Sequence, residues 1–366
     1  MSDDNVKQQD RNDKSYDAGF KMHYLKPKYW TSWIGILFLG ILAFVPAVIR
    51  DAVADLLAFL LYRIDIKFKK FVKINLTMAF PTMSEEEKEQ CYRSFLRVGL
   101  KVIFGYGESF YKSGKYLKEH YLCIGREYLD EALATGKPII FMAPHAWSID
   151  RCGLYLSAND LKMCTMMHTS KNEVYDWFMN TIRLKYGGKV FERSAGVRAV
   201  IRALKDGYSS FFLPDEDLGV KSVVFADFFA AKKATLTTMS KMSKLGNAVV
   251  VPMLSTYNEK KHAYEVVFGK MYQNYPSGND ELDAQIMNRS IEELLQGRIE
   301  QYMWFLRVYR TRPDTESFNQ LYDRKYSYEY IRDYILNTLH PGRSGDAKEV
   351  SASEGPEAAN AGETSP

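Results

Sequence analysis

The chain has 366 residues, of which 46% are hydrophobic and 26% charged, a globular composition that excludes disorder along its whole length. Forty-nine Lys and Arg against 45 Asp and Glu leave a net charge of +4, too small a surplus to predict nucleic-acid binding. The four cysteines show no CxxC spacing and no paired histidines, so they predict buried thiols in a reducing compartment rather than a disulfide framework or a zinc site.

The N-terminal region changes character near residue 28. Residues 1–28 are polar and mixed in sign, without regular apolar spacing, and we expect them to form a mobile leader. No charged residue stands between Lys28 and Arg50. A helix over residues 29–49 is long enough to cross a hydrocarbon core of about 30 Å. This run predicts a membrane anchor helix over 29–49.

The form and the orientation of this anchor stay open. Pro46 can kink or end a helix near Phe44, so a re-entrant segment or a buried core helix is the alternative to a complete span. Six Lys and Arg residues precede the run, over 7–28, and six follow it, over 50–73. The positive-inside rule therefore does not choose an orientation.

Residues 51–118 are predicted to be helical. Apolar side chains such as Leu56 and Leu60 recur at the spacing of one buried helix face, and Ser84 followed by three glutamates predicts a capped helix start. Glu108 stands in an aromatic stretch of this region. A carboxylate there either reaches water or belongs to a site, because burying it unpaired is costly. We count it among the candidate substrate-binding residues.

Short apolar runs alternate with helical stretches in the middle of the chain. We predict buried strands over 138–143, 209–213 and 248–253, and helices near 150–158, 172–186, 196–206 and 232–245. Such alternation predicts an α/β domain, here over 50–340, with a mixed but largely parallel sheet flanked by helices. Residues 341–366 contain no Leu, Ile or aromatic residue and predict a disordered tail.

The first of these strands is followed by a histidine and an aspartate. His145 and Asp150 would diverge by about 140° on one helix, so they can meet only if His145 lies in the loop and Asp150 in the first turn of the next helix. Asp150 would then orient the imidazole and His145 would serve as a general base. The spacing alone is weak, and a surface or core histidine is the alternative. Its place after a strand, where α/β folds bind ligands, favours a site.

The second strand leads into three acidic residues, Asp215, Glu216 and Asp217. Like His145, they follow a predicted strand, so we expect them to form a second wall of the same crevice. A polar loop with a helix cap is the alternative. Mg²⁺ sites usually need a phosphate partner as well, so we predict no metal. Arg193, between a strand and a helix, is a candidate for a phosphate or an oxyanion, because guanidinium groups bind such oxygens in pairs.

The C-terminal part of the domain has an aromatic run followed by arginines, over 301–313. This pattern is typical of a core helix with a solvated end. The alternative is a docking surface for anionic lipid or for an acidic carrier protein.

Several segments resemble the late acyltransferases of bacterial lipid A biosynthesis, within the lysophospholipid-acyltransferase-like superfamily. The resemblance runs in order from about residue 24 to about residue 325. Its segments are KPKYWTSWIGI at 26–36, HAWSID at 145–150, HTSKNEVYDWFMNTIRLKYGGK at 168–189, FLPDEDLG at 212–219, FADFFAAKKATL at 225–236 and QYMWFLRVYRTRP at 301–313. The HxxxxD motif ends here in Asp150, as in the myristoyltransferase branch, whereas Glu is usual in the lauroyltransferase branch.

The resemblance implies a glycerolipid-acyltransferase-like fold and a reaction. A fatty acyl group would pass from acyl carrier protein, a co-substrate rather than a cofactor, to a hydroxyl of a hydroxyacyl chain on a Kdo-bearing lipid A precursor. His145 would be the base and Asp150 its orienter, while Arg193, Asp215 and Asp217 would line the site. The implied partners are acyl carrier protein, the lipid A precursor and membrane lipids, with no nucleic acid. The implied location is the bacterial inner membrane, with the catalytic domain facing the cytoplasm.

Two other functions remain as alternatives. A glycerophospholipid acyltransferase of the same superfamily would show NHxxxxD and a Gly-Thr-Arg loop, but Pro144 precedes the histidine here and Asp215 to Asp217 replace such a loop. An inactive membrane scaffold or lipid-binding module is disfavoured by the His145 and Asp150 pair. The length of the acyl chain, the acylation state of the acceptor and the oligomeric state are not predicted.

Overall fold

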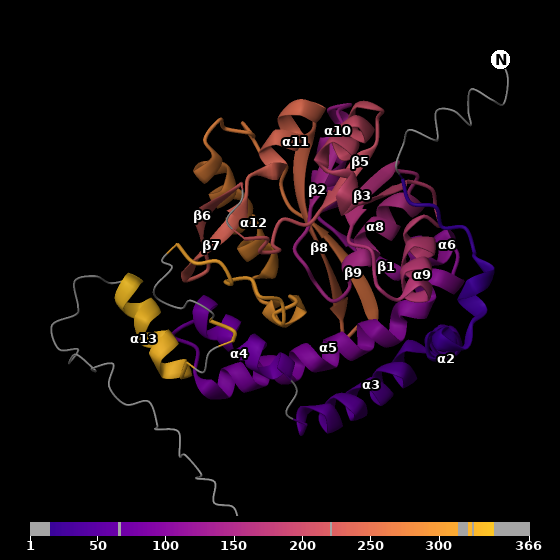
Figure 1. The fold of residues 1–366 in the computed structure, drawn as a ribbon, viewed down its shortest axis with the longest axis horizontal. Helices are drawn as coiled ribbons and strands as arrows, with labels where there is room; N and C mark the ends of the chain where they lie inside the picture. The colour runs from indigo at the N-terminus through magenta and orange to yellow at the C-terminus, as the bar shows by residue number, and fades with distance from the viewer. Residues whose placement is uncertain (1–14, 65–66, 220–221, 314–320, 324–325, 340–366) are drawn as a thin grey trace, which may run out of the picture.

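The computed structural model describes residues 15–64, 67–219, 222–313, 321–323 and 326–339. The strands are β1 (Tyr121–Ile124), β2 (Ile139–Met142), β3 (Met163–Met167), β4 (Lys189–Glu192), β5 (Ser209–Phe212), β6 (Val223–Phe228), β7 (Ala231–Leu236), β8 (Val249–Asn258) and β9 (Ala263–Phe268). Within these residues a seven-stranded sheet has the order β1-β9-β8-β2-β5-β3-β4, and β6 pairs with β7 separately (Figure 1). Among the described strands of the large sheet, β8 and β9 are the one antiparallel pair.

Helices lie on both faces of the large sheet and along one end of it. They are α2 (Trp30–Leu42), α3 (Ala47–Tyr62), α4 (Lys67–Ala79), α5 (Glu85–Tyr111), α6 (Gly114–His120), α7 (Arg126–Ala134), α8 (Ile149–Ala158), α9 (Glu173–Arg183), α10 (Val197–Lys205), α11 (Thr238–Gly246), α12 (Asp280–Leu295) and α13 (Tyr328–Leu339). This arrangement confirms the predicted α/β class with a mixed, largely parallel sheet. The predicted strands over 138–143, 209–213 and 248–253 correspond to β2, β5 and β8.

Strand β2 shows why the core has two halves. Ile139 and Phe141 pack into one apolar cluster, which includes side chains of α7, α8 and α9. Ile140 and Met142 pack into the other cluster, which includes side chains of α10, α11 and α12. Successive side chains of a strand point to opposite faces, so a strand covered on both faces reads as the continuous apolar run seen in the sequence.

The prediction of one continuous helix over 29–49 is wrong. Helix α2 ends at Leu42, and α3 starts after Pro46, which stands at its N-cap. The 13 residues of α2 span only about 20 Å at 1.5 Å per residue. In the described part of the chain no helix combines the length and the apolar character that a bilayer span needs. The break arises because proline cannot donate the backbone hydrogen bond that would continue α2.

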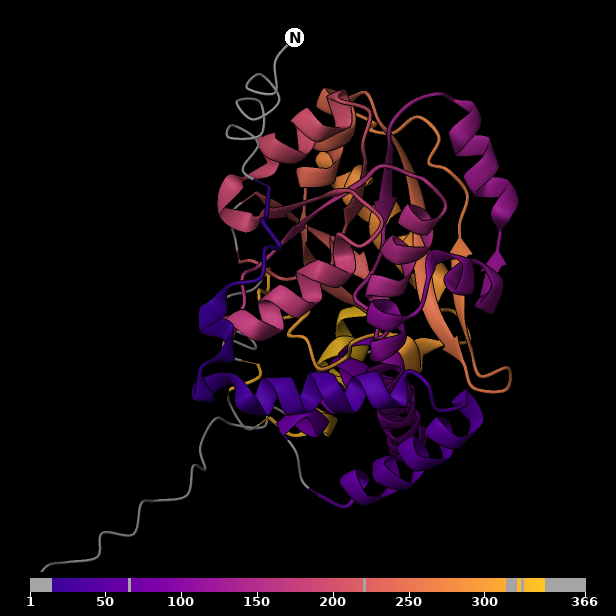
Figure 2. The same ribbon diagram turned by 90° about the vertical axis from the view of Figure 1, so that its right-hand side faces the viewer.

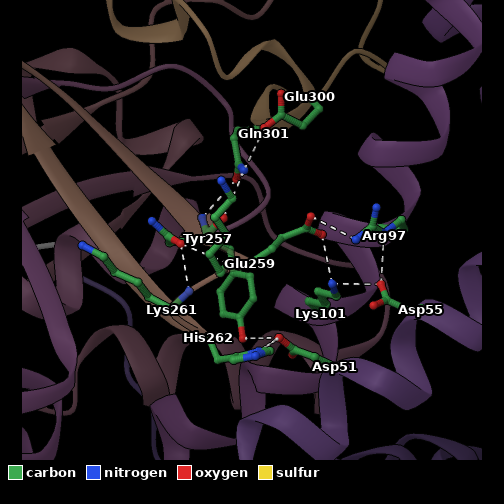
Figure 3. A network of polar contacts seen from close by, with 12 residues as sticks. Asp51, Asp55, Arg97, Lys101, Tyr257, Glu259, Lys261, His262, Glu300 and Gln301 are labelled. Carbon is green, nitrogen blue, oxygen red and sulfur yellow. Dashed lines mark hydrogen bonds and ion pairs between the residues drawn. The ribbon is translucent and has the colours of Figure 1, made fainter.

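Helix α3 turns back against α5 because its charged residues have partners there. Arg50 Nη1 donates to Glu108 Oε1 at 2.8 Å, and both side chains are buried. Asp51 is also buried, and its Oδ2 accepts hydrogen bonds from the hydroxyl of Tyr257 at 2.8 Å and from Nδ1 of His262 at 2.7 Å (Figure 3). These contacts join α3 to both α5 and the β8–β9 hairpin. The charges that end the apolar run therefore lie inside the protein.

A second set of ion pairs extends this connection along α5. Asp55 of α3 pairs with Arg97 at 3.1 Å and with Lys101 at 2.8 Å. Glu259, in the hairpin turn, pairs with the same two cations at 3.2 and 3.0 Å (Figure 3). Two carboxylates from separate elements thus share two cations of α5, which fixes the angle at which α3 lies on the domain.

Residues 15–28, expected to be part of a mobile leader, pack on the domain. The N–H of Tyr16 donates to the carbonyl of Val190 at 2.6 Å, at the edge of β4. Tyr24 is buried, and its ring and that of Phe20 contact Trp177 of α9. The aromatic side chains of this segment bury apolar area against the domain. Because they are not regularly spaced, the sequence pattern did not indicate this packing. Residues 1–14 and the predicted tail over 341–366 lie outside the described residues.

Candidate active site

His145 and Asp215 occupy equivalent positions on two neighbouring strands. Met142 of β2 pairs with Phe212 of β5 in parallel register, and each candidate residue stands three positions beyond its member of that pair. The N–H of Ala143 donates to the carbonyl of Phe212 at 3.0 Å, so the pairing continues past the ends of the strands. Parallel strands present their carboxyl ends at one edge, and this brings the two loops together.

Asp215 holds His145 by two hydrogen bonds. The backbone N–H of His145 donates to Oδ2 at 2.7 Å, and the ring Nδ1 lies 2.6 Å from Oδ1. The Asp215 side chain is 0% exposed, whereas that of His145 is 23% exposed. A carboxylate on Nδ1 fixes that nitrogen as the donor, which leaves Nε2 as the nitrogen that can accept a proton.

Each residue of the pair shifts the pKa of the other. Burial acts to lower the pKa of His145, but the charge and the hydrogen bond of Asp215 outweigh it and raise this pKa above its ordinary value of 6.5. Burial acts to raise the pKa of Asp215, and the charge and hydrogen bonds of His145 outweigh it, so this pKa is lowered. Asp215 therefore stays ionised at neutral pH and stabilises a protonated imidazole.

The loop that carries His145 is also fixed by segment 301–313. The N–H of Met303 donates to the carbonyl of His145 at 2.9 Å, and the N–H of Trp147 donates to the carbonyl of Gln301 at 3.1 Å. Tyr302 and Trp304 are buried, so this segment belongs to the core. It is not the helix that the sequence pattern suggested, because the short 3-10 turn Ile299–Gln301 ends at its start and the described residues 302–313 are irregular. The site loop is thereby held from a third part of the chain.

Asp150 lies in the first turn of α8, as predicted, but its partners differ from the prediction. Its Oδ1 accepts a hydrogen bond from Nε of Arg183 at 2.8 Å, and its Oδ2 accepts one from the hydroxyl of Tyr106 at 2.5 Å. Burial acts to raise the pKa of Asp150, and the Arg183 charge outweighs it, so this pKa is lowered. The expected contact of Asp150 with the imidazole is corrected: the carboxylate on the ring is Asp215. The reason is that β5, not the start of α8, faces Nδ1.

A cavity of about 480 Å³ opens beside this pair. His145 and Asp150 line it, together with Arg183 and Arg193. Much of the remaining wall is apolar and includes Leu154, Met163, Met166, Val190, Phe211 and Leu236. A largely apolar cavity with polar groups in its wall suits a ligand that has a hydrocarbon part and a reactive polar group.

Arg193 lies in the wall of this cavity, where the sequence placed it. It follows β4 directly, and its Nη2 pairs with Oε2 of Glu216 at 2.5 Å. Both side chains are more than 40% exposed. Its guanidinium is thus held by Glu216, yet it stays accessible to an anionic group in the cavity.

Two other predicted substrate-binding residues have partners within the protein and are not among the residues that line the cavity. Asp217 accepts hydrogen bonds from the N–H and the hydroxyl of Thr311, at 2.5 and 2.7 Å, and so anchors the end of segment 301–313. Glu108 forms the buried ion pair with Arg50. Each carboxylate is thus neutralised or hydrogen-bonded within the protein, and its assignment to substrate binding stays a prediction.

The acidic residues after β5 also separate from one another. The Asp215 carboxylate is hydrogen-bonded to His145, that of Glu216 to Arg193 and that of Asp217 to Thr311. Among the residues that the structure describes, no three His, Cys, Asp or Glu side chains gather as metal ligands would.

Sequence reasoning missed Arg183, Tyr106 and the pairing of His145 with Asp215. The pairing has a signal in the sequence, since both residues stand at the same distance beyond adjacent apolar runs. Arg183 and Tyr106 come from α9 and α5, whose orientation toward the cavity depends on the three-dimensional packing.

Comparisons with known proteins show which family this chain belongs to. Residues 17–311 match the family model described as bacterial lipid A biosynthesis acyltransferase. A lipid A biosynthesis acyltransferase of Haemophilus influenzae is 38% identical over 84% of this chain and 95% of its own length. The lipid A biosynthesis myristoyltransferase of Escherichia coli K12 is 29% identical over 86% of this chain and 97% of its own, and the lauroyltransferase of that organism is 26% identical over 81% and 96%. The chain therefore belongs to the bacterial lipid A biosynthesis acyltransferase family.

Proposed function

We propose that this protein transfers a fatty acyl chain from acyl carrier protein to a hydroxyl of a hydroxyacyl chain on a Kdo-bearing lipid A precursor, with His145 as general base. The observation that carries the proposal is the hydrogen-bonded pair of His145 and Asp215, with His145 in the wall of a largely apolar cavity. Membership of the family supplies the substrate class.

In the proposed reaction Nε2 of His145 takes the proton of the acceptor hydroxyl as its oxygen attacks the thioester carbonyl. The C–O bond forms, and the tetrahedral intermediate then breaks its C–S bond, so that the carrier thiol leaves with the proton returned by the imidazolium. Asp215 stabilises the imidazolium meanwhile. General base catalysis of this kind contributes about 10²–10⁴-fold. The thioester is already activated, so no nucleophilic side chain is needed.

The cations of the cavity suit the charges of the substrates. Arg183 and Arg193 line the same cavity as His145. Guanidinium groups bind phosphate oxygens in pairs, and the carrier's prosthetic arm and the lipid A precursor both carry phosphates. Either arginine is also a candidate to stabilise the oxyanion. By contrast, several N–H groups at the start of α8 already donate to carbonyls, as Ile149 does to Ala146 at 3.1 Å.

We propose a myristoyl-type donor. Two facts support this: the motif ends in Asp150, and a myristoyltransferase is among the relatives that match most of the chain. The apolar wall of the cavity supports binding of a long acyl chain, because each methylene buried in it contributes about 0.8 kcal/mol.

We propose that α2 and α3 bind the surface of the inner membrane from its cytoplasmic side. Apolar side chains of both helices and of their junction are exposed, namely Trp30, Ile34, Leu37, Phe38, Ile41, Phe44, Val48, Ile49, Val53, Leu56, Phe59 and Leu60. Both helices lie together at one end of the molecule (Figure 2). Lys112 lies over the ring of Phe44 and Arg63 over that of Phe59, so cations border the apolar surface. An apolar surface bordered by cations suits anionic lipid head groups.

The purified protein in detergent tests the reaction directly. It is given myristoyl-acyl carrier protein and a Kdo-bearing lipid A precursor, and the products are read by mass spectrometry and by release of the carrier thiol. We expect a mass gain of one acyl chain for the wild type and none for His145→Gln, with Lys232→Met as an active surface control. Transfer to lysophosphatidate but not to the lipid A precursor, or full activity of His145→Gln, would contradict the proposal.

A further inference from the structure

Helices α10 and α11 carry a group of exposed cations, which we call the basic surface. On α10 they are Arg198, Arg202 and Lys205, which are four and three residues apart and so project from one side of the helix. On α11 they are Lys241 and Lys244, three residues apart. All five side chains are exposed, and no ion pair between described residues includes one of them. Their charges are therefore available to a partner.

The two helices form one continuous surface. They pack so closely that a Cβ atom on Gly246 of α11 would lie 2.7 Å from Cδ1 of Leu204 of α10. Segments 193–206 and 238–247 together contain six Lys and Arg residues and one Asp. This excess of five positive charges is larger than the net charge of +4 of the whole chain. Positive charge is thus concentrated on these two helices.

The basic surface begins at the wall of the cavity. Val197, in the first turn of α10, and Thr238, in the first turn of α11, both line the cavity. Arg193 precedes α10 and lines it too, and its pairing with Glu216 leaves both side chains more than 40% exposed. From Val197 to Lys205 the helix extends only about 12 Å at 1.5 Å per residue. A partner bound on this surface is therefore within reach of the cavity through a flexible arm.

The basic surface is separate from the proposed membrane surface. Helices α10 and α11 lie at one end of the molecule, α2 and α3 lie at the other, and the large sheet lies between them (Figures 1 and 2). At physiological ionic strength, screening limits the attraction between exposed charges to about 8 Å. Lipid head groups under α2 and α3 are thus too far away to neutralise these cations. Their position favours a soluble acidic partner.

We propose that the basic surface is the docking site for acyl carrier protein, whose carboxylates pair with its cations while the acyl arm enters the cavity past Arg193. Leu245, which is 55% exposed beside Lys244, adds an apolar contact. The identity of this partner rests on the proposed function, since the carrier is the donor there. Docking is nevertheless a binding event and can be measured without turnover.

The test is the binding of fluorescently labelled myristoyl-acyl carrier protein to the full-length protein in neutral detergent, without acceptor, followed by fluorescence anisotropy. We expect Arg198→Glu with Arg202→Glu to weaken binding by about tenfold or more, and Lys241→Glu with Lys244→Glu to do the same, because each pair of substitutions reverses two charges that face the partner. Added salt should weaken binding by the wild type more than binding by either double variant.

The matched control is Lys260→Glu with Lys261→Glu. It reverses two exposed charges in the turn between β8 and β9, outside the basic surface, and so makes the same change in net charge. This variant should bind the carrier as the wild type does. Circular dichroism checks that all three double variants are folded.

Kinetics with the lipid A precursor separate docking from the chemical step. Both basic-surface variants should raise KM for myristoyl-acyl carrier protein by about tenfold, with KM for the precursor and kcat at saturating carrier close to the wild-type values. Unchanged carrier binding in both folded variants would overturn the docking site. Unchanged carrier binding together with lost binding to phosphatidylglycerol vesicles would overturn it too, and would assign the surface to lipid. Carrier binding that depends on the basic surface, in a wild type that transfers no acyl chain, would support the docking site and contradict the proposed function.

Discussion

Nδ1 of His145 and Oδ1 of Asp215 lie 2.6 Å apart, and each residue stands three positions beyond the end of its own strand. Because β2 and β5 are parallel neighbours in register, their carboxyl ends place the two residues face to face. The pairing thus follows from sheet topology and not from closeness in sequence. It assigns to Asp215 the role that the HxxxxD spacing suggested for Asp150.

Asp215→Asn should lower kcat by about 10²–10⁴-fold while the protein stays folded, because an amide cannot stabilise the imidazolium and permits the wrong tautomer. Loss of the carboxylate should also lower the pKa of His145, so the acidic limb of kcat/KM should move to lower pH. In the wild type we expect the midpoint of this limb above 6.5, since the neutral imidazole is the active form and its pKa is raised. Glu216→Gln, at the adjacent position, should keep most of the rate.

Asp150→Asn should behave differently. Its partners are Arg183 and Tyr106, so the substitution should cost about 2 kcal/mol of unfolding free energy and lower activity by displacing Arg183. The acidic limb of kcat/KM should stay where it is in the wild type. The measurement is the pH profile beside that of Asp215→Asn, and an equal shift in both variants would show that Asp150 contacts the imidazole during catalysis.

Glu108→Ala should destabilise the protein by about 3 kcal/mol or more, because it leaves Arg50 buried without its carboxylate. Its kcat and the position of its acidic limb should remain close to the wild-type values in the folded fraction, since Glu108 is not among the residues that line the cavity. Chemical denaturation and the pH profile measure these two effects. Replacing both partners with Arg50→Met and Glu108→Leu should recover much of the lost stability, and failure of activity in that stable double variant would return Glu108 to the site.

Leu37→Asp and Leu56→Asp should each weaken binding to anionic vesicles by about tenfold, because each removes an exposed apolar side chain from the proposed membrane surface. Sedimentation with vesicles of phosphatidylglycerol and phosphatidylethanolamine measures this binding. Leu282→Asp is the matched control, since Leu282 is an exposed leucine of α12. Equal binding by all three variants would place the membrane surface elsewhere.

Much of the fold could be predicted from the sequence because its signals are local. The continuous apolar run at 138–143 is what burial on both faces of a strand requires. Ser84 and Glu87 form the capping box that the helix start indicates. The candidate base, His145, follows from its position after such a strand.

The remaining features depend on contacts between distant segments. The charge-free run at 29–49 has the length of a membrane helix, and Pro46 indicates a break within it. That the chain then turns back depends on the partners of Arg50 and Asp51, which lie far away in the sequence on α5 and the β8–β9 hairpin. The burial of Glu108 likewise depends on Arg50.

The most direct test of the account is the mass of lipid A from a bacterium that lacks its own last acyltransferase, with and without this protein. We predict a gain of one acyl chain with the wild type, no gain with His145→Gln or Asp215→Asn, and a gain with Glu216→Gln, at equal amounts of protein in the membrane. An unchanged mass with the wild type would contradict the proposed reaction. A full gain with Asp215→Asn would contradict the assignment of the His145–Asp215 pair.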